Sequence, residues 1–362
     1  MPTVTTDGTA HAWAGPAGRE HTLSRVASAH SPAQSPIKSA ARTDDGPDTE
    51  TSPWRTSLAA YVETTKPGIT KLVTITSMVG LGMALAQRWI AGDRVWSGWD
   101  LAIIVVGSIV GTALSASGAN ALNQWAERDR DGLMPRTAKR PLPSGTLLPS
   151  RVLAVASALV VVGLGVLWLT SGLAAMCVSA ACVGVYLFLY TPLKTQTWTA
   201  TLVGAIPGAL PPLIGWCAGY REFGFEATVA PGGVALFMLM FVWQLPHFLA
   251  IAWMYREDYA RGGHAVLPVV DQSGVKTSIV IAAFTVLLIP ATVSPVIALP
   301  RVLGPLSLFT AAVSGLLFAG LVARLLKTRT REHARAVFFA SIIHLPLLLV
   351  VMVLDAFVHT FF

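Results

Sequence analysis

The sequence predicts an all-α, polytopic membrane protein with about nine transmembrane helices. Of its 362 residues, 53% are hydrophobic and only 12% are charged, whereas a soluble domain has about 25% charged residues. From residue 67 onward, apolar stretches follow one another, each about 20 residues long and sufficient to cross a hydrocarbon core of about 30 Å. The stretches lack the alternation of barrel strands, and lipid offers no partners to backbone amides, so helices are expected.

The N-terminal residues differ in composition from the rest of the chain. Residues 1–55 are rich in Ser, Thr, Ala, Pro and Asp, which predicts a disordered polar tail. They contain no secretory apolar segment, and the acidic run Asp44, Asp45, Asp48 and Glu50 argues against a mitochondrial transit peptide. We therefore expect a transmembrane domain over residues 56–362, in a bacterial inner membrane.

The expected spans follow in order along this domain. They lie near residues 67–87, 99–122, 152–171, 173–191, 198–219, 229–254, 277–298, 303–325 and 336–358. Only Ser171 and Gly172 separate the third from the fourth span, so a count of eight is the main alternative.

The distribution of Lys and Arg predicts the orientation. Fifteen of them follow the even-numbered spans, and only four lie in the alternate loops. The fifteen are Arg128, Arg130, Arg136, Lys139, Arg140, Arg151, Lys194, Arg256, Arg261, Lys276, Arg324, Lys327, Arg329, Arg331 and Arg335, and the four are Arg88, Arg94, Arg221 and Arg301. This asymmetry places the N-terminus and the basic loops in the cytoplasm. It also explains the net charge of +7 without nucleic-acid binding, because the basic residues lie between apolar runs.

A row of oxygen-bearing side chains follows the second span. Asn123, Glu127 and Asp131 stand four residues apart, so on a helix they share one face, with a step of about 6 Å. An amide and two carboxylates suit Mg²⁺, which leaves coordination positions for phosphate. A solvated loop whose acids balance neighbouring arginines is the alternative.

Basic side chains lie at the same membrane face. Arg136 and Arg140 follow the acidic row, Lys66 precedes the first span and Lys194 follows the fourth. Arginines of this kind hold a pyrophosphate in a bidentate manner. The alternative is that each of these cations only contributes to the positive-inside distribution.

The sixth span carries polar residues within an apolar segment. Gln244 and His247 lie inside it, and Asp258 and His264 follow in the next basic loop. Intramembrane polar groups normally face the bundle interior or a cavity, so both are candidates for function. For His247, an interhelical hydrogen bond is the competing interpretation.

Together these motifs resemble the UbiA-type intramembrane prenyltransferases, and within them the haem O synthase branch. The resemblance rests on Asn123–Asp131, the string Met134–Leu142, Tyr190–Lys194, Trp243–Phe248 and Asp258–Gly263, and it extends over about residues 60–356. Glu127 stands where many members have Asp, and Met254 replaces the first acid of the second motif of quinone-type relatives. The second departure favours the haem-modifying branch.

The resemblance implies a UbiA-type helix bundle and transfer of a farnesyl group from farnesyl pyrophosphate to a vinyl group of protohaem IX, for haem-copper oxidase biogenesis. It assigns Mg²⁺ as cofactor, and haem A synthase or oxidase assembly factors as candidate partners. By the same resemblance, the roles are Mg²⁺ binding for Asn123, Glu127, Asp131 and Asp258, pyrophosphate binding for Lys66, Arg136, Arg140 and Lys194, and haem contact for Gln244, His247 and His264.

Two other functions stay open. One is prenylation of a quinone precursor or a chlorophyll-type ring. The other is a multispan transporter or haem-handling factor without catalysis. Transporters tend to place charges near the bilayer midplane on broken helices, whereas the acids here cluster at one membrane face.

Overall fold

A computed structural model describes residues 53–93 and 97–362 of the chain. Residues 1–52 of the predicted polar tail lie outside the described residues. The last three residues of that predicted tail belong to α1 (Pro53–Thr64), so the helical domain begins three residues earlier than expected. All regular structure in the described ranges is helical. The predicted fold class is therefore confirmed.

Nine helical segments of the described ranges are long and apolar enough to cross a membrane. They are α2 (Pro67–Ile90), α3 (Gly98–Asp131), α4 (Pro149–Ser171), the continuous segment Leu173–Leu193, α7 (Ala200–Gly219), α8 (Pro231–Met254), α11 (Val275–Ala298), α12 (Pro305–Thr328) and α13 (Arg331–Phe361). The third and fourth spans are separate, because Gly172 (φ 93°) adopts a conformation that ends α4. The count of nine is confirmed over the count of eight.

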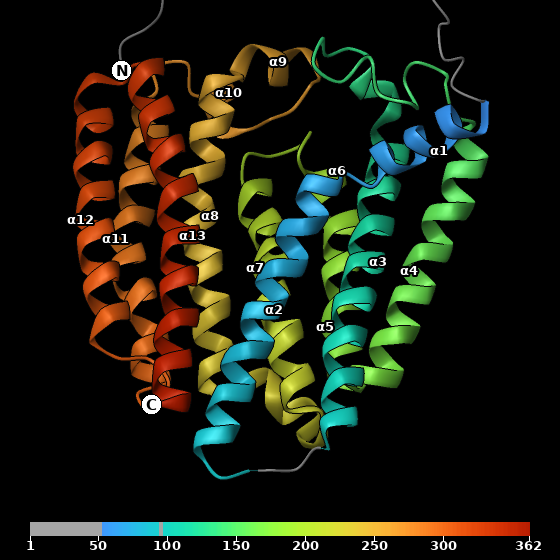
Figure 1. Ribbon diagram of the computed structural model, residues 1–362. Helices are drawn as coiled ribbons and strands as arrows, with labels where there is room; N and C mark the ends of the chain where they lie inside the picture. The colour runs from blue at the N-terminus through green and yellow to red at the C-terminus, as the bar shows by residue number, and fades with distance from the viewer. Residues whose placement is uncertain (1–52, 94–96) are drawn as a thin grey trace, which may run out of the picture. The chain divides into compact units, whose positions relative to one another are not determined.

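Short elements connect the spans. The 3-10 segment η2 (Arg221–Val229) joins α7 to α8, and α9 (Arg256–Arg261) and α10 (Leu267–Val270) join α8 to α11. Figure 1 shows α1, α9 and α10 at the same end of the bundle as the C-terminal end of α3. This is the end at which the predicted site residues gather.

The second span is longer than its apolar stretch. The side chain of Ser97 accepts a hydrogen bond from the Asp100 amide at 3.1 Å and starts α3 with a capping box. The helix then continues nine residues past the expected end at residue 122, to Asp131. The acidic row is thus helical throughout.

The fourth span changes its helical type near its end. Its first part is α5 (Leu173–Gly184), its second part is the π-helix η1 (Val185–Tyr190), and α6 (Thr191–Leu193) completes it. Single-turn π-helices of this kind occur frequently at functional sites, because they alter the direction of the side chains that follow.

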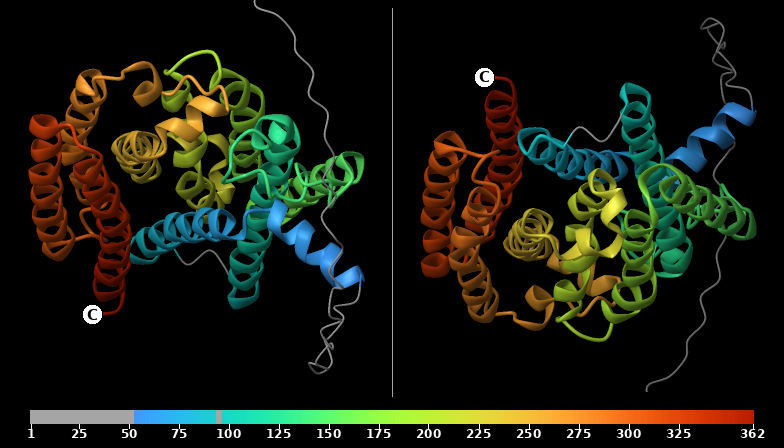
Figure 2. Two further views of the ribbon diagram at one scale, coloured as in Figure 1. Left: turned by 90° about the horizontal axis from the view of Figure 1, so that it is seen from above. Right: turned by 90° about the horizontal axis from the view of Figure 1, so that it is seen from below.

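Helices α7 and α8 form the interior of the bundle. In its most apolar 18-residue window, 67% of α7 is buried, against 22% in α4 and α12. Helix α7 packs on α2, α5 and α8, and α8 packs on α11 and α13. In Figure 2, α7 and α8 accordingly lie between α2–α5 on one side and α11–α13 on the other.

Glycines permit the closest helix contacts. A Cβ atom on Gly215 of α7 would lie 1.7 Å from the carbonyl oxygen of Ser77 in α2, and one on Gly163 of α4 would lie 2.5 Å from the Ser115 amide of α3. Small residues at such crossings let backbones approach within van der Waals distance, which drives helix association in lipid. These contacts fix the position of α3, which carries the acidic row, and of α2, which directly follows the cation Lys66.

Candidate active site

The acidic row lies on one buried face of α3. Asn123, Glu127 and Asp131 have exposed fractions of 2%, 6% and 2%. The alternative of a solvated loop is therefore wrong for these side chains. Because burial of uncompensated carboxylates is costly, each requires a partner.

Asn123 joins three spans through its side-chain amide. Lys66, which directly precedes α2, donates from Nζ to Asn123 Oδ1 at 2.8 Å. On the other side, Asn123 Nδ2 donates to Thr191 Oγ1 at 3.1 Å. The Thr191 hydroxyl in turn donates to the Tyr186 carbonyl at 2.8 Å, inside the π-helix. The π-helix thus orients the hydroxyl that holds Asn123.

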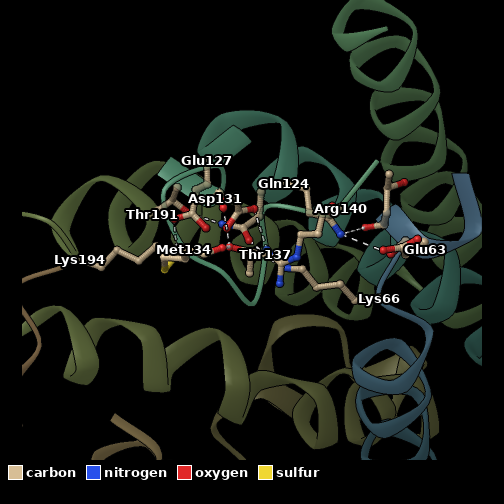
Figure 3. A network of polar contacts seen from close by, with 12 residues as sticks. Glu63, Lys66, Gln124, Glu127, Asp131, Met134, Thr137, Arg140, Thr191 and Lys194 are labelled. Carbon is tan, nitrogen blue, oxygen red and sulfur yellow. Dashed lines mark hydrogen bonds and ion pairs between the residues drawn. The ribbon is translucent and has the colours of Figure 1, made fainter. Parts of the chain in front are cut away.

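The two carboxylates of the row each pair with a cation from a different segment. Lys194 Nζ forms an ion pair with Glu127 Oε1, and Arg140 donates from a guanidinium nitrogen to Asp131 Oδ2 at 2.7 Å. Figure 3 shows both carboxylates with Lys66, Arg140 and Lys194 around them. Three of the four cations predicted to bind pyrophosphate therefore converge on the row.

Lys66 occupies an unusual position at the edge of this network. Its backbone is left-handed (φ 49°), a conformation that is costly for a residue with a Cβ atom and is concentrated at functional sites. Burial, with contributions from the nearby charges of Arg140 and Lys194, lowers the pKa of its ammonium to about 7. An anion bound beside Lys66 would favour the charged form of this ammonium.

Lys194 is held by both its side chain and its backbone. Its Nζ lies 5.1 Å from the centroid of the Tyr190 ring, a cation–π contact one turn earlier on the same helix. Its carbonyl accepts a hydrogen bond from the Ala265 amide at 2.9 Å. The fourth span is thereby connected to the segment after α9.

The loops after α3 and α8 contact each other above this network. Arg136 lies over the Tyr255 ring at 5.8 Å, and a Cβ atom on Gly262 would lie 2.8 Å from Met134 Sδ. Arg136 thus lies against the α8–α9 connection. The second predicted motif is adjacent to the first.

Asp258 does not join the acidic row directly. It pairs with Arg261 at 3.3 Å within α9, and it lines a polar pocket of about 330 Å³ together with Arg256, Arg329 and Arg331. Within residues 53–93 and 97–362, no three His, Cys, Asp or Glu side chains come close enough together to hold a metal ion. A shared metal role for Asp258 therefore stays a prediction, which would require α9 to shift.

His264 lies deeper than its position in a loop suggested. Its side chain is buried, with an exposed fraction of 5%, and its ring contacts the Tyr259 ring edge-on at 5.6 Å. Burial, and then the charge of Lys194, lower the pKa of its imidazole. His264 Nδ1 has no hydrogen-bond partner among the described residues. The charges of Glu127 and Asp131 also act on this imidazole, so His264 lies near the acidic row.

Gln244 and His247 face neighbouring helices inside the bundle. Gln244 Nε2 donates to the carbonyls of Met240 at 2.9 Å and Ala205 at 3.3 Å. His247 Nδ1 is hydrogen-bonded to Ser341 Oγ of α13 at 2.7 Å. The interhelical hydrogen bond that the sequence left open for His247 is therefore present. A haem contact for either residue stays a prediction.

Sequence reasoning gave no role to two residues of the site. Thr191 positions the amide of Asn123, and Tyr255 stacks under Arg136. Thr191 lies in the Tyr190–Lys194 motif, which was the available signal. Tyr255 directly precedes the Arg256–Tyr259 segment of the second motif, but a juxtamembrane tyrosine is ordinary at a membrane interface and no role was assigned to it.

The residues of the row fit a hard divalent cation. Their side chains present one amide oxygen and two carboxylates at successive helical turns, the oxygen donors that Mg²⁺ accepts. With so few protein oxygens, an ion there would take further ligands from phosphate. Lys66, Arg140 and Lys194, which now neutralise these oxygens, lie where such a phosphate would be bound.

Comparisons with known proteins agree with this arrangement. The family model of the UbiA prenyltransferase family matches residues 73–343. A protoheme IX farnesyltransferase of Solibacter usitatus is 43% identical over 82% of this chain and 98% of its own length. A second protoheme IX farnesyltransferase, from Koribacter versatilis, is 36% identical over 82% of this chain and 93% of its own length.

Solved structures share the fold at low sequence identity. A structure of digeranylgeranylglyceryl phosphate synthase superposes with a TM-score of 0.66 at 17% identity, and covers 83% of this chain and 98% of that one. A UbiA homolog from Archaeoglobus fulgidus bound to GPP and Mg²⁺ superposes with a TM-score of 0.53 at 13% identity, over 82% of this chain and 99% of that one. From the family model and the identity to these relatives together, the chain belongs to the UbiA prenyltransferase family.

Proposed function

We propose that this chain transfers a farnesyl group from farnesyl pyrophosphate to a vinyl group of protohaem IX and releases pyrophosphate. The observation that carries the proposal is the buried row Asn123, Glu127 and Asp131, in which each side chain is paired with a cation. The names of the two curated relatives support the choice of farnesyl donor and haem acceptor.

Asn123, Glu127 and Asp131 would hold Mg²⁺, with Asp258 as a further candidate ligand. The archaeal relative bound to GPP and Mg²⁺ is a precedent for this ion in the fold. When bound, Mg²⁺ neutralises charge on the pyrophosphate and so makes it a better leaving group.

The basic side chains supply the remaining stabilisation. Lys66, Arg140 and Lys194 surround the row, and Arg136 lies above it. As the allylic C–O bond breaks, negative charge develops on the pyrophosphate, and fixed cations stabilise this charge without reorganisation. The vinyl group of haem then attacks the farnesyl cation and forms a C–C bond. Water adds to the second cation and loses a proton, which leaves a hydroxyethyl group.

The proposal is tested by product mass. Purified protein in lipid nanodiscs is incubated with protohaem, farnesyl pyrophosphate and Mg²⁺, and the haem is analysed by mass spectrometry. A haem that gains one farnesyl and one hydroxyl group is expected, and Glu127→Gln serves as the inactive control. A product from a quinone precursor or a chlorophyll-type ring, with none from haem, would overturn the choice of acceptor. Lack of any prenylated product, with haem bound, would favour a haem-handling protein.

We further propose a bacterial inner membrane as the location, with the active-site end in the cytoplasm. The basic loops after α3 and α8 both lie at the end of the bundle that carries the acidic row (Figure 1). Short loops rich in Lys and Arg stay on the cytoplasmic side of the membrane. Haem A synthase or oxidase assembly factors are proposed partners for the product.

A further inference from the structure

A second candidate site lies between α12 and α13, apart from the acidic row. The two helices form a groove of about 530 Å³. Its walls include Leu316, Leu317 and Ile343, whose side chains are exposed on the outside of the bundle, where lipid surrounds a membrane protein. Two polar residues that the proposed reaction does not use, Arg324 and His344, also line it.

His344 is the unusual member of the groove. Its exposed fraction is 2%, and neither ring nitrogen has a hydrogen-bond partner among residues 53–93 and 97–362. Its ring stacks on Phe318 of α12 with a centroid distance of 5.8 Å. An unpaired polar group buried in a membrane span is costly and is retained mainly where it has a function. Both nitrogens are covered by protein, so a ligand in the groove would supply the missing partner once the ring turns from Phe318 toward it.

Arg324 provides a charge at one end of the same groove. It follows Phe318 by six residues on α12, which is about 9 Å along the helix axis. Its guanidinium makes no ion pair with any residue of the described ranges. The groove thus combines an apolar wall, an imidazole of a metal-ligating type and a cation without an ion-pair partner among the described residues.

We propose that the α12–α13 groove binds haem from the bilayer, with His344 as an axial ligand of the iron and Arg324 paired with a propionate. This proposal rests on the proposed function only for the identity of the acceptor. The macrocycle matches the apolar walls, neutral imidazole is a common haem ligand, and guanidinium pairs with carboxylate. An anionic lipid would use the walls and Arg324 but would leave both imidazole nitrogens unpaired.

The groove lies next to the contact between α13 and α8. One turn before His344 on α13, Ser341 is hydrogen-bonded to His247 of α8. Neighbouring turns of α13 therefore contact two different helices. His344 stacks on Phe318 of α12, and Ser341, one turn earlier, is bonded to His247 of α8.

The test is a haem titration that does not depend on turnover. Full-length protein in nanodiscs is titrated with ferric haem, and the Soret band reports the iron ligand. His344→Phe keeps an aromatic ring against Phe318, and His333→Gln, at the start of α13, is the matched control. We expect His344→Phe to remove the imidazole-ligated spectrum and weaken haem binding at least tenfold, while metal-free protoporphyrin binds as in the parent. Arg324→Gln should weaken both porphyrins several-fold and leave the Soret position unchanged.

Several outcomes would overturn the proposal. The first is a parent-like Soret band and haem affinity in His344→Phe. The second is a loss of haem binding in His333→Gln equal to that in His344→Phe. The third is loss of co-purified anionic lipid in Arg324→Gln with haem binding unchanged. The last result would make the groove a lipid site. The same titrations in a Glu127→Gln background separate the two proposals. If Glu127→Gln ligates haem as the parent does and the added His344→Phe removes this ligation, the haem site in the groove is supported. This holds whether or not the parent produces farnesylated haem.

Discussion

Lys66 Nζ lies 2.8 Å from Asn123 Oδ1, although 57 residues separate them in the chain. The contact joins the residue before α2 to the first member of the acidic row on α3. Because burial lowers the pKa of the Lys66 ammonium to about 7, its charge changes near neutral pH.

This relationship predicts a pH dependence of pyrophosphate binding. Above pH 7 the Lys66 ammonium is increasingly neutral in the free protein, and a bound anion favours its charged form. Affinity for a non-reactive pyrophosphate analogue should therefore fall as the pH rises from 7 to 9. In Lys66→Arg, whose guanidinium stays charged, the fall should be weaker. Calorimetric titrations at several pH values measure it, and an equal slope in both proteins would contradict the role of Lys66.

The carboxylates of the row should be required for turnover rather than for folding. We expect Glu127→Gln or Asp131→Asn to reduce turnover by about 10²-fold or more, the scale seen when a preorganised charge-stabilising group is lost. Chelation of Mg²⁺ should abolish turnover of the parent. Size-exclusion profiles and thermal unfolding of the variants in nanodiscs provide the control. Near-parent activity in both variants would remove the metal role.

The charge asymmetry predicts the topology. Reporter fusions after residues 140 and 265 should both be cytoplasmic, and a fusion after residue 224 should be external. These positions follow α3, α9 and α7, respectively. Opposite locations for 140 and 265 would contradict a site shared by the loops after α3 and α8.

His247 permits a matched comparison of haem contact with packing. His247→Ala removes the imidazole, whereas Ser341→Ala removes only its hydrogen-bond partner. If His247 contacts haem, His247→Ala should weaken haem binding several-fold and leave the pyrophosphate analogue unaffected, while Ser341→Ala changes both little. If His247 only packs, both variants should lower thermal stability, by roughly 1 kcal/mol for one interhelical hydrogen bond, and affect both substrates equally. Paired titrations with haem and the analogue distinguish these results.

The apolar stretches determined the fold class and the approximate positions of the spans, whereas the conformation of Gly172 decided nine spans over eight. This was possible because each span must satisfy its own backbone in lipid and be about 20 residues long. The four-residue spacing placed Asn123, Glu127 and Asp131 on one helix face, since helical periodicity is local. Their burial was not predictable, because it depends on α2 and the fourth span packing against α3.

Tertiary structure alone decided which predicted residues meet. Lys66, Arg140 and Lys194 converge on the row from three separate segments, whereas Asp258 pairs with Arg261 in α9. Sequence distance carries no information on such pairings, because they follow from helix crossings set by small residues such as Gly215. In the sequence, His344 is likewise only one polar residue within an apolar stretch. Only the packing of α12 on α13 shows that both its nitrogens lack partners within the described chain.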